Sequence, residues 1–251
     1  MNERLRHEQH FHDEQAQERR QGWEANPALL RFPAEDYLDH EPWVRPALAR
    51  LGNLQYKRVV DFGCGHGMAS TSLARMGAHV IAFDLSSGYV HEAVCRAKSN
   101  QVAIEGVVAD GAHLPFRDGS MDAIWGVAIL HHLELTHAAK EIKRVLAPGG
   151  QAVFCEPWGG NQLLELARRY LPYAGKERTA DERPLTADDL RQIQTVFPSA
   201  ELQFVQLSGM IRRAWKNCPL LPMLDRLDGA ILRHWLTLRP WCRYVVVHLI
   251  K

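Results

Sequence analysis

One short run of residues constrains the fold of this chain more than any other. A β-branched pair leads to an acid, and three glycines then occupy every second position, in the run Val59-Val60-Asp61-Phe62-Gly63-Cys64-Gly65-His66-Gly67. Buried parallel strands are apolar runs, and glycine lets the chain turn sharply and lets a ligand approach bare backbone. Helical periodicity begins at Met68. The run therefore predicts a strand, a glycine turn and a helix, the arrangement with which a doubly wound sheet forms a nucleotide crevice.

The spacing of these glycines narrows the class of ligand. A dinucleotide fingerprint has the pattern G-x-G-x-x-G. Here the third glycine, Gly67, comes one residue early, and Met68 stands in the place of the usual glycine. The spacing favours a ligand without a pyrophosphate group.

Apolar and helical segments alternate beyond the glycine turn. Residues 80–84 form a second apolar run that ends in Asp84, whose carboxylate can accept hydrogen bonds from both hydroxyls of a ribose. Residues 104–109 predict a third strand, and Asp110 beyond it could accept from an adenine amino group. The predicted elements that follow are a strand over 122–128, a helix over 134–146 stopped by Pro148-Gly149-Gly150, and a strand over 152–156.

The remaining segments extend this α/β pattern. The 46% content of hydrophobic residues in 251 suffices for a sizeable core. We predict N-terminal helices over 1–56 and a main domain over 57–251, with insertions at about 158–200 and 208–241. The individual elements predicted are a marginal helix over 1–24, a helix over 35–52, a helix over 163–171, a loop over 175–181, a helix capped by Thr186 and ended by Phe197-Pro198, and strands over 202–207 and 243–250.

From about Val59 to Glu156 the chain resembles the class I methyltransferases that use S-adenosylmethionine. The resemblance rests on five motifs in order: 61–67 (Asp-Phe-Gly-Cys-Gly-His-Gly), 83–86 (Phe-Asp-Leu-Ser), 109–116 (Ala-Asp-Gly-Ala-His-Leu-Pro-Phe), 129–132 (Ile-Leu-His-His) and 145–150 (Val-Leu-Ala-Pro-Gly-Gly). It is greatest to the branch that methylates small molecules, including sugar and natural-product hydroxyls. It implies a doubly wound, Rossmann-like sheet of seven mostly parallel strands, with N-terminal helices that form a lid over the cofactor.

The resemblance also implies where S-adenosylmethionine would bind. It places Asp84 at the ribose, Asp110 and Ala112 near the adenine, and Asp61 either beneath the glycine loop or at the amino-acid end of the cofactor. The thiol of Cys64 is expected to pack under the loop rather than to act as a nucleophile. The implied cofactor-binding residues are Asp61, Gly63, Cys64, Gly65, Gly67, Asp84, Leu85, Asp110, Gly111, Ala112 and Ala128.

A hydroxyl acceptor becomes a good nucleophile only when its proton is removed. Histidine, with a reference pKa of roughly 6.5, suits this task near neutral pH. His131 and His132 follow the fourth predicted strand, and the resemblance places such a pair at the acceptor pocket. Glu156, at the end of the fifth strand, could accept a proton or orient a histidine. An acceptor that is already ionised would need only positioning.

Composition and residue spacing argue against several other classes of protein. A net charge of +1 and the lack of an Asn/Asp-Pro-Pro-aromatic motif after the fourth strand argue against a nucleic-acid partner. Five cysteines without a C-x-x-C pair indicate reduced thiols and predict a cytoplasmic protein. No apolar run approaches the roughly 20 residues of a membrane span. No metal-ligand spacing is found, and the cluster of His7, His10 and His12 is expected to be solvated, so we predict no metal.

The C-terminal insertion leaves alternatives open. From Ser208 to Lys251 the chain has eight basic residues against two acids, with Trp215, Trp235 and Trp241 among them. We favour a helical hairpin that buries its leucines; the alternative is a basic, aromatic lid that recruits an anionic or lipid-like substrate. The leading hypothesis is therefore methyl transfer to a small-molecule hydroxyl. The competing ones are a methyltransferase for a lipid, RNA or protein, a non-catalytic cofactor-binding subunit, and a nicotinamide dehydrogenase.

Overall fold

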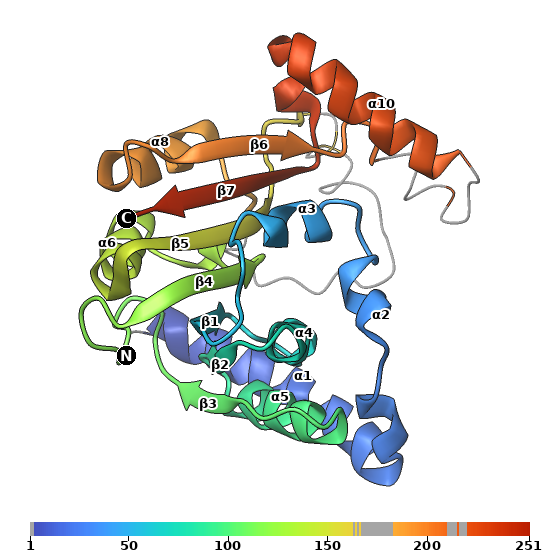
Figure 1. Ribbon diagram of the computed structural model, residues 1–251, viewed down its shortest axis with the longest axis vertical. Coiled ribbons are helices and arrows are strands. Elements are labelled where there is room, and N and C mark those ends of the chain that lie inside the picture. The colour runs from blue at the N-terminus through green and yellow to red at the C-terminus, as the bar shows by residue number, and fades with distance from the viewer. Residues whose placement is uncertain (1–2, 163, 165, 167–182, 210–214, 216–219) are drawn as a thin grey trace.

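A seven-stranded sheet forms the centre of the protein in a computed structural model that describes residues 3–162, 164, 166, 183–209, 215 and 220–251. The strand order is β3-β2-β1-β4-β5-β7-β6, and only β7 runs antiparallel to its neighbours (Figure 1). This arrangement confirms the predicted doubly wound, mostly parallel α/β sheet. The strands are β1 Arg58–Phe62, β2 His79–Asp84, β3 Glu105–Val108, β4 Met121–Val127, β5 Leu146–Pro157, β6 Glu201–Val205 and β7 Tyr244–Ile250.

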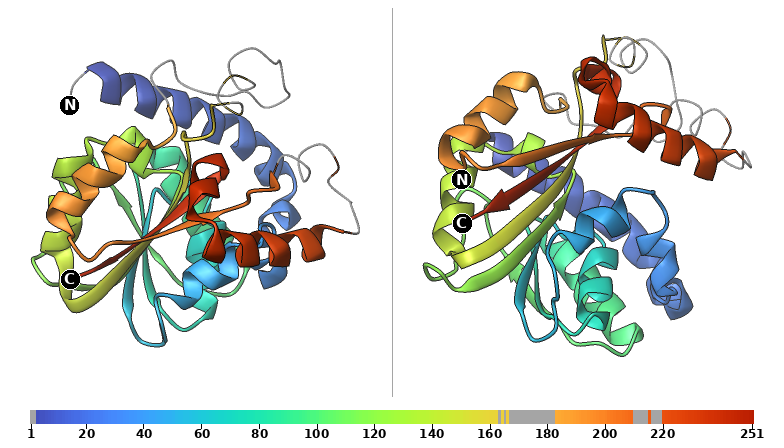
Figure 2. Two further views of the ribbon diagram at one scale, coloured as in Figure 1. Left: turned by 90° about the horizontal axis from the view of Figure 1, so that it is seen from above. Right: turned by 45° about the horizontal axis from the view of Figure 1, so that its top comes forward.

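Helices cover both faces of this sheet (Figure 2). Alternate residues of each strand point to opposite faces, and in β1 Val59 joins one apolar cluster while Val60 and Phe62 join the other. The face of Val59 is covered by α2 Ala34–Leu38, α3 Val44–Ala49 and α4 Met68–Arg75, and the opposite face by α6 Leu135–Val145 and α8 Ala187–Val196. The other described helices are α1 Glu3–Ala25, α5 Ser87–Ser99 and α10 Leu221–His234, with 3-10 turns η1 Pro27–Leu30, η2 Leu130–His132 and η3 Leu236–Trp241.

The glycine turn between β1 and α4 has the predicted form. Helix α4 begins at Met68, and Gly67 before it has φ +82°, a conformation that favours glycine. A Cβ on Gly67 would lie 2.4 Å from the Cα of Ala93 in α5. Glycine at this position is what allows the turn to approach the backbone of α5.

Two predicted helices have different bounds. The helix predicted over 35–52 is interrupted into α2 and α3, because Pro42 restricts Glu41 before it to extended conformations. The helix predicted over 134–146 ends at Val145, and the Pro-Gly-Gly run lies within β5 instead of separating helix from strand.

The C-terminal third is confirmed in part. Thr186 caps α8, since its hydroxyl accepts from the amide of Asp189 and the Asp189 carboxylate accepts from the amide of Thr186. The helix predicted over 163–171 and the loop over 175–181 lie almost wholly outside the described residues. In the second insertion α10 is followed by η3, and Leu220, Leu227 and Leu236 are exposed, so the expected burial of its leucines is wrong for these three.

Candidate active site

A cavity of about 240 Å³ lies at the carboxyl ends of β1, β2 and β4. The order of the strands reverses between β1 and β4, and ligands of open α/β sheets bind in the crevice at such a point. His132 lines this cavity, together with the following predicted cofactor-binding residues: Gly63, Gly65, Asp84, Leu85, Asp110, Gly111 and Ala128.

A second cavity, of about 420 Å³, borders the same glycine turn. It shares Gly63, Gly65 and His66 with the first cavity and extends toward α2. Asp61 and Cys64, both predicted at the cofactor, line this second cavity. A ligand lying across the turn would therefore have one end in each cavity.

Three of the residues predicted to bind the cofactor do not line the first cavity but pack behind its walls. Cys64 is buried against Ala82 and Ala93, which is the expected packing under the loop, and burial raises the pKa of its thiol. Gly67 contacts α5. The amide of Ala112 donates to the Asp110 carboxylate at 2.9 Å, so this residue shapes the turn that carries Asp110.

Asp84 ends β2 with its carboxylate held by backbone amides. One oxygen accepts from the amide of Gly65 and the other from the amide of Ser86, both at 2.9 Å. Burial raises the pKa of Asp84, and these two amides oppose the rise. Because a carboxylate oxygen has two lone pairs, each can accept a further hydrogen bond from a ligand hydroxyl.

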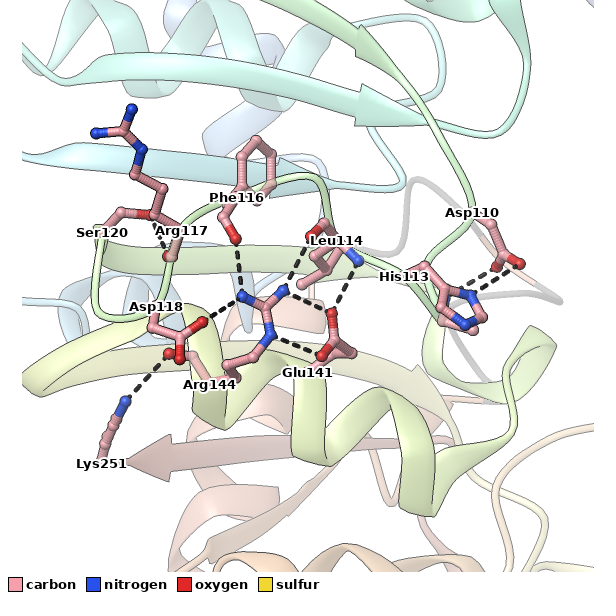
Figure 3. A network of polar contacts seen from close by, with 11 residues as sticks. Asp110, His113, Leu114, Phe116, Arg117, Asp118, Ser120, Glu141, Arg144 and Lys251 are labelled. Carbon is pink, nitrogen blue, oxygen red and sulfur yellow. Dashed lines mark hydrogen bonds and ion pairs between the residues drawn. The ribbon is translucent and has the colours of Figure 1, made fainter.

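The loop that carries Asp110 is anchored from α6 (Figure 3). The guanidinium of Arg144 donates to the backbone oxygens of Leu114 and Phe116, at 2.9 and 2.8 Å. It also pairs with Glu141, which in turn accepts from the amide of Leu114 at 3.0 Å. The network fixes the path of the chain at Leu114 and Phe116, just beyond Asp110.

Asp61 lies in the interior at the second cavity. Its side chain accepts a hydrogen bond from the hydroxyl of Ser70 in α4. Burial, opposed by the Ser70 hydrogen bonds, raises the pKa of Asp61 to about 7. The carboxyl group is thus poised between its neutral and ionised forms near neutral pH.

His131 and Glu156 form a buried pair behind the first cavity. Nδ1 of His131 lies 2.7 Å from one carboxylate oxygen of Glu156, and the other oxygen accepts from the amides of Ile129 and Leu130 at 2.9 Å. The two side chains are 2% and 0% exposed. Glu156 orients His131 and the turn after β4 from below, and it does not line either cavity at the glycine turn.

His132, in contrast, lines the first cavity and meets the N-terminal helix. Its Nδ1 pairs with the carboxylate of Glu8 in α1, 124 residues away in the sequence. Its ring lies over that of His131, with the centroids 4.2 Å apart. Of the two predicted bases, His132 is the one placed at the ligand cavity.

Helix α1 supplies site residues that the sequence motifs do not reveal. Leu5, Glu8 and His12 line the first cavity, beside Tyr89 of α5, so His12 is half-buried at the site instead of solvated as expected. Polar contacts tie the helix to α5, among them a bidentate pair between the half-exposed Arg19 and the buried Glu92. No spacing rule marks such residues, because their partners are distant in the sequence.

His66 is a further site residue that the sequence analysis did not single out. It borders both cavities. Burial, with the nearby charges of Arg19 and Arg96, lowers the pKa of His66 to about 4 and keeps its ring neutral. Within the described part of the chain, no group of three or more histidine, cysteine or acidic side chains could hold a metal ion.

Known proteins with similar sequences are methyltransferases. Residues 60–154 match the protein family described as Methyltransferase domain. A demethylmenaquinone methyltransferase of Clavibacter sepedonicus is 39% identical over 101 residues, 40% of this chain and 41% of that protein. A fatty-acid O-methyltransferase of Mycolicibacterium smegmatis is 30% identical over 192 residues, 75% of this chain and 61% of that protein. The chain thus spans less than two thirds of either relative.

Among solved structures, the fold is similar to that of geranyl diphosphate C-methyltransferase from Streptomyces coelicolor. That enzyme was crystallised with Mg²⁺, geranyl-S-thiolodiphosphate and S-adenosyl-L-homocysteine. The TM-score is 0.60 at 17% identity, with 82% of this chain and 74% of that chain covered. With a seven-stranded sheet of this strand order and a match to the Methyltransferase domain family over residues 60–154, this chain has the fold of the class I S-adenosylmethionine-dependent methyltransferases.

Proposed function

We propose that the protein transfers a methyl group from S-adenosylmethionine to a small-molecule acceptor, and that the acceptor atom is a hydroxyl oxygen. The observation that carries this proposal is the convergence of Asp84, Asp110 and His132 on one cavity beside the glycine turn. The first two offer carboxylate acceptors to a nucleoside, and the third offers a base to the acceptor.

The residues that line the two cavities fit S-adenosylmethionine. Asp84 has lone pairs for the ribose hydroxyls, and Asp110 faces the cavity where an adenine would lie. A Cβ at Gly65 would meet no atom within 4 Å, so the backbone there is bare toward the ligand space. Asp61 in the second cavity can meet the ammonium group at the amino-acid end. When bound, S-adenosylmethionine supplies an activated methyl group on a sulfonium.

The chain itself then has to align the acceptor and take its proton. A hydrogen bond from Nδ1 of His132 to the Glu8 carboxylate selects the tautomer in which Nε2 carries the lone pair. We assign Nε2 as the proton acceptor and Glu8 as the residue that positions the ring. His131 and Glu156 support that ring from behind, and we assign them no contact with substrate.

The N-terminal segment has two roles in this proposal. Residues of α2 and α3, such as Val44 and Leu48, are buried with strand residues and belong to the core. Helix α1 forms a wall of the ligand cavity and acts as the lid proper. We retain residues 57–251 as the catalytic domain with its two insertions.

A second candidate acceptor is a carboxylate, and the 30% identical fatty-acid O-methyltransferase favours it. A carboxylate is ionised near neutral pH and needs no base. The two acceptors are separable, because only the hydroxyl requires His132.

Replacing Asp84 by alanine tests the cofactor site. The change removes two charge-assisted hydrogen bonds worth on the order of 1.5–3 kcal/mol each, so we expect affinity for S-adenosylhomocysteine to fall by on the order of 100-fold or more. Isothermal titration calorimetry measures it. Asp188→Ala, which removes an exposed acid of α8 that lines neither cavity, is the matched control and should bind as the unaltered protein does.

Transfer of a labelled methyl group to a panel of hydroxyl, carboxylate and quinol compounds then tests turnover. Cofactor binding with no transfer to any compound would favour a non-catalytic subunit. Unchanged affinity in Asp84→Ala would refute the ribose assignment.

A further inference from the structure

Exposed apolar side chains gather on the second insertion. Fourteen large hydrophobic residues are exposed in the described part of the chain, and six of them fall within residues 220–241: Leu220, Met223, Leu227, Trp235, Leu236 and Trp241. Trp235, at the end of α10, is 63% exposed. Large apolar surface concentrated in this way marks an interaction site more often than chance scatter does.

Helix α10 separates its residues by face. Leu221, Asp228 and Leu232 are buried on the side toward the body of the protein. Met223 and Leu227, four residues apart, lie one above the other on the opposite side and are 51% and 46% exposed. The helix therefore presents an apolar stripe to its surroundings, in addition to the face that it buries.

Charges divide in the same way. Arg226 and Arg233 are both exposed: Arg226 lies beside the stripe, and Arg233 lies at the edge of the helix, where it also lines the cavity between α10 and β6. Both acids of the helix lie on the other side: Asp228 is buried and accepts from the amide and the hydroxyl of Ser208 at 2.9 Å, and Asp225 is half-buried. The outward face of α10 thus combines apolar and cationic side chains without an acid.

The topology puts α10 at the same edge of the sheet as the candidate active site. β5 and β6 both pair antiparallel with β7, so β6 runs in the direction of the parallel strands. Its carboxyl end, from which the chain leads to α10, lies at the same edge of the sheet as the carboxyl ends of β1 and β4 (Figure 1). Because β5 and β7 lie between β6 and β4, a partner on the outward face of α10 would lie to one side of the candidate active site, at the same edge of the sheet.

We propose that the outward face of α10, with Trp235 and Leu236 after it, docks on the surface of an anionic membrane. Helices that lie in the membrane interface combine an apolar stripe, flanking arginines and terminal tryptophans, and their binding depends on anionic lipid. None of the described helices has the length and apolar character to cross a membrane, so the contact is with the surface. Docking does not depend on the proposed methyl transfer.

Sedimentation with lipid vesicles tests the docking in the absence of cofactor and acceptor. We expect the protein to pellet with vesicles of equal parts phosphatidylcholine and phosphatidylglycerol, much more than with phosphatidylcholine alone, and to be released by salt. Arg226→Gln and Arg233→Gln should each lower partitioning about fivefold, since an arginine near such a surface is worth about 1 kcal/mol. The unaltered protein should shift its tryptophan emission to shorter wavelength on the vesicles, and Met223→Ser with Leu227→Ser should lower binding further and abolish that shift.

Matched controls lie elsewhere on the surface. Lys57→Gln and Lys98→Gln remove exposed cations, and Leu29→Ser removes an exposed leucine, so these variants should partition as the unaltered protein does. Equal binding by α10 variants and controls, or no binding to either vesicle, would overturn the proposal. So would light scattering that showed a dimer dissolved by the α10 changes, because the face would then be an interface between copies.

Discussion

Replacing His132 by glutamine is expected to lower turnover of a hydroxyl acceptor by about 10²–10⁴-fold, the usual contribution of general-base catalysis. Glutamine is close in size and can still form a hydrogen bond with Glu8, but it cannot take a proton at neutral pH. Affinity for S-adenosylhomocysteine should stay within about twofold, because the cofactor residues are untouched. Single-turnover transfer of a labelled methyl group, alongside calorimetry, measures both quantities.

Two comparisons sharpen this test. His137→Gln alters an exposed histidine of α6 and should leave the rate unchanged. Glu8→Gln keeps an acceptor for Nδ1 but removes the charge, so a positioning role predicts a fall in kcat with little change in KM, restored in part by Glu8→Asp. Full activity of His132→Gln on a hydroxyl acceptor would refute the base assignment; full activity on a carboxylate alone would favour the second candidate acceptor.

Replacing Asp61 by asparagine is expected to stabilise the protein in alkaline solution and to weaken cofactor binding. The pKa of Asp61 is raised to about 7 by burial, above the value near 3.8 of an unfolded chain. Between pH 3.8 and about 7 the Asp61 carboxyl is protonated in the folded state and ionised in the unfolded state. Its contribution to stability is therefore full below pH 3.8 and is lost as the pH rises to about 7. A pKa difference of about three corresponds to on the order of 4 kcal/mol in the free energy of unfolding.

Urea unfolding at several pH values measures this effect. Asparagine stays neutral and can still accept from Ser70, so the difference in unfolding free energy between Asp61→Asn and the unaltered protein should grow as pH rises from 4 to 8. A difference independent of pH would contradict the raised pKa. Asp61→Asn should bind S-adenosylmethionine more weakly than the unaltered protein does, because the variant has no anion to pair with the ammonium group of the cofactor.

Local patterns were sufficient to predict the sheet and the glycine turn. Runs such as Val59-Val60 identify buried strands because both faces of a parallel sheet are covered. Gly67 is identifiable because a left-handed turn between strand and helix strongly favours glycine. The motif order then placed Asp84, Asp110 and the histidine pair at one edge of the sheet.

Long-range polar pairing lay beyond such patterns. The sequence of α1 shows only sparse apolar positions, and its docking depends on ion pairs such as Arg19 with Glu92. For the same reason the sequence does not identify Glu8 as a site residue, because its partner His132 lies 124 residues further along the chain. Glu156 ends a strand in the expected place, but the turn after β4 closes over it, and only the packed structure shows its burial.

The position of α1 has a consequence for the order of events in turnover. Because this helix walls the cleft, a molecule of nucleoside size passes in or out most readily when α1 swings away from α5. That movement breaks the pair of Arg19 and Glu92 and the hydrogen bond from the Ser86 hydroxyl to Asp13, 2.6 Å long. Ionic strength weakens such partly exposed contacts. Salt that weakens these contacts should therefore ease the movement of α1 and, with it, the passage of a ligand into and out of the cleft.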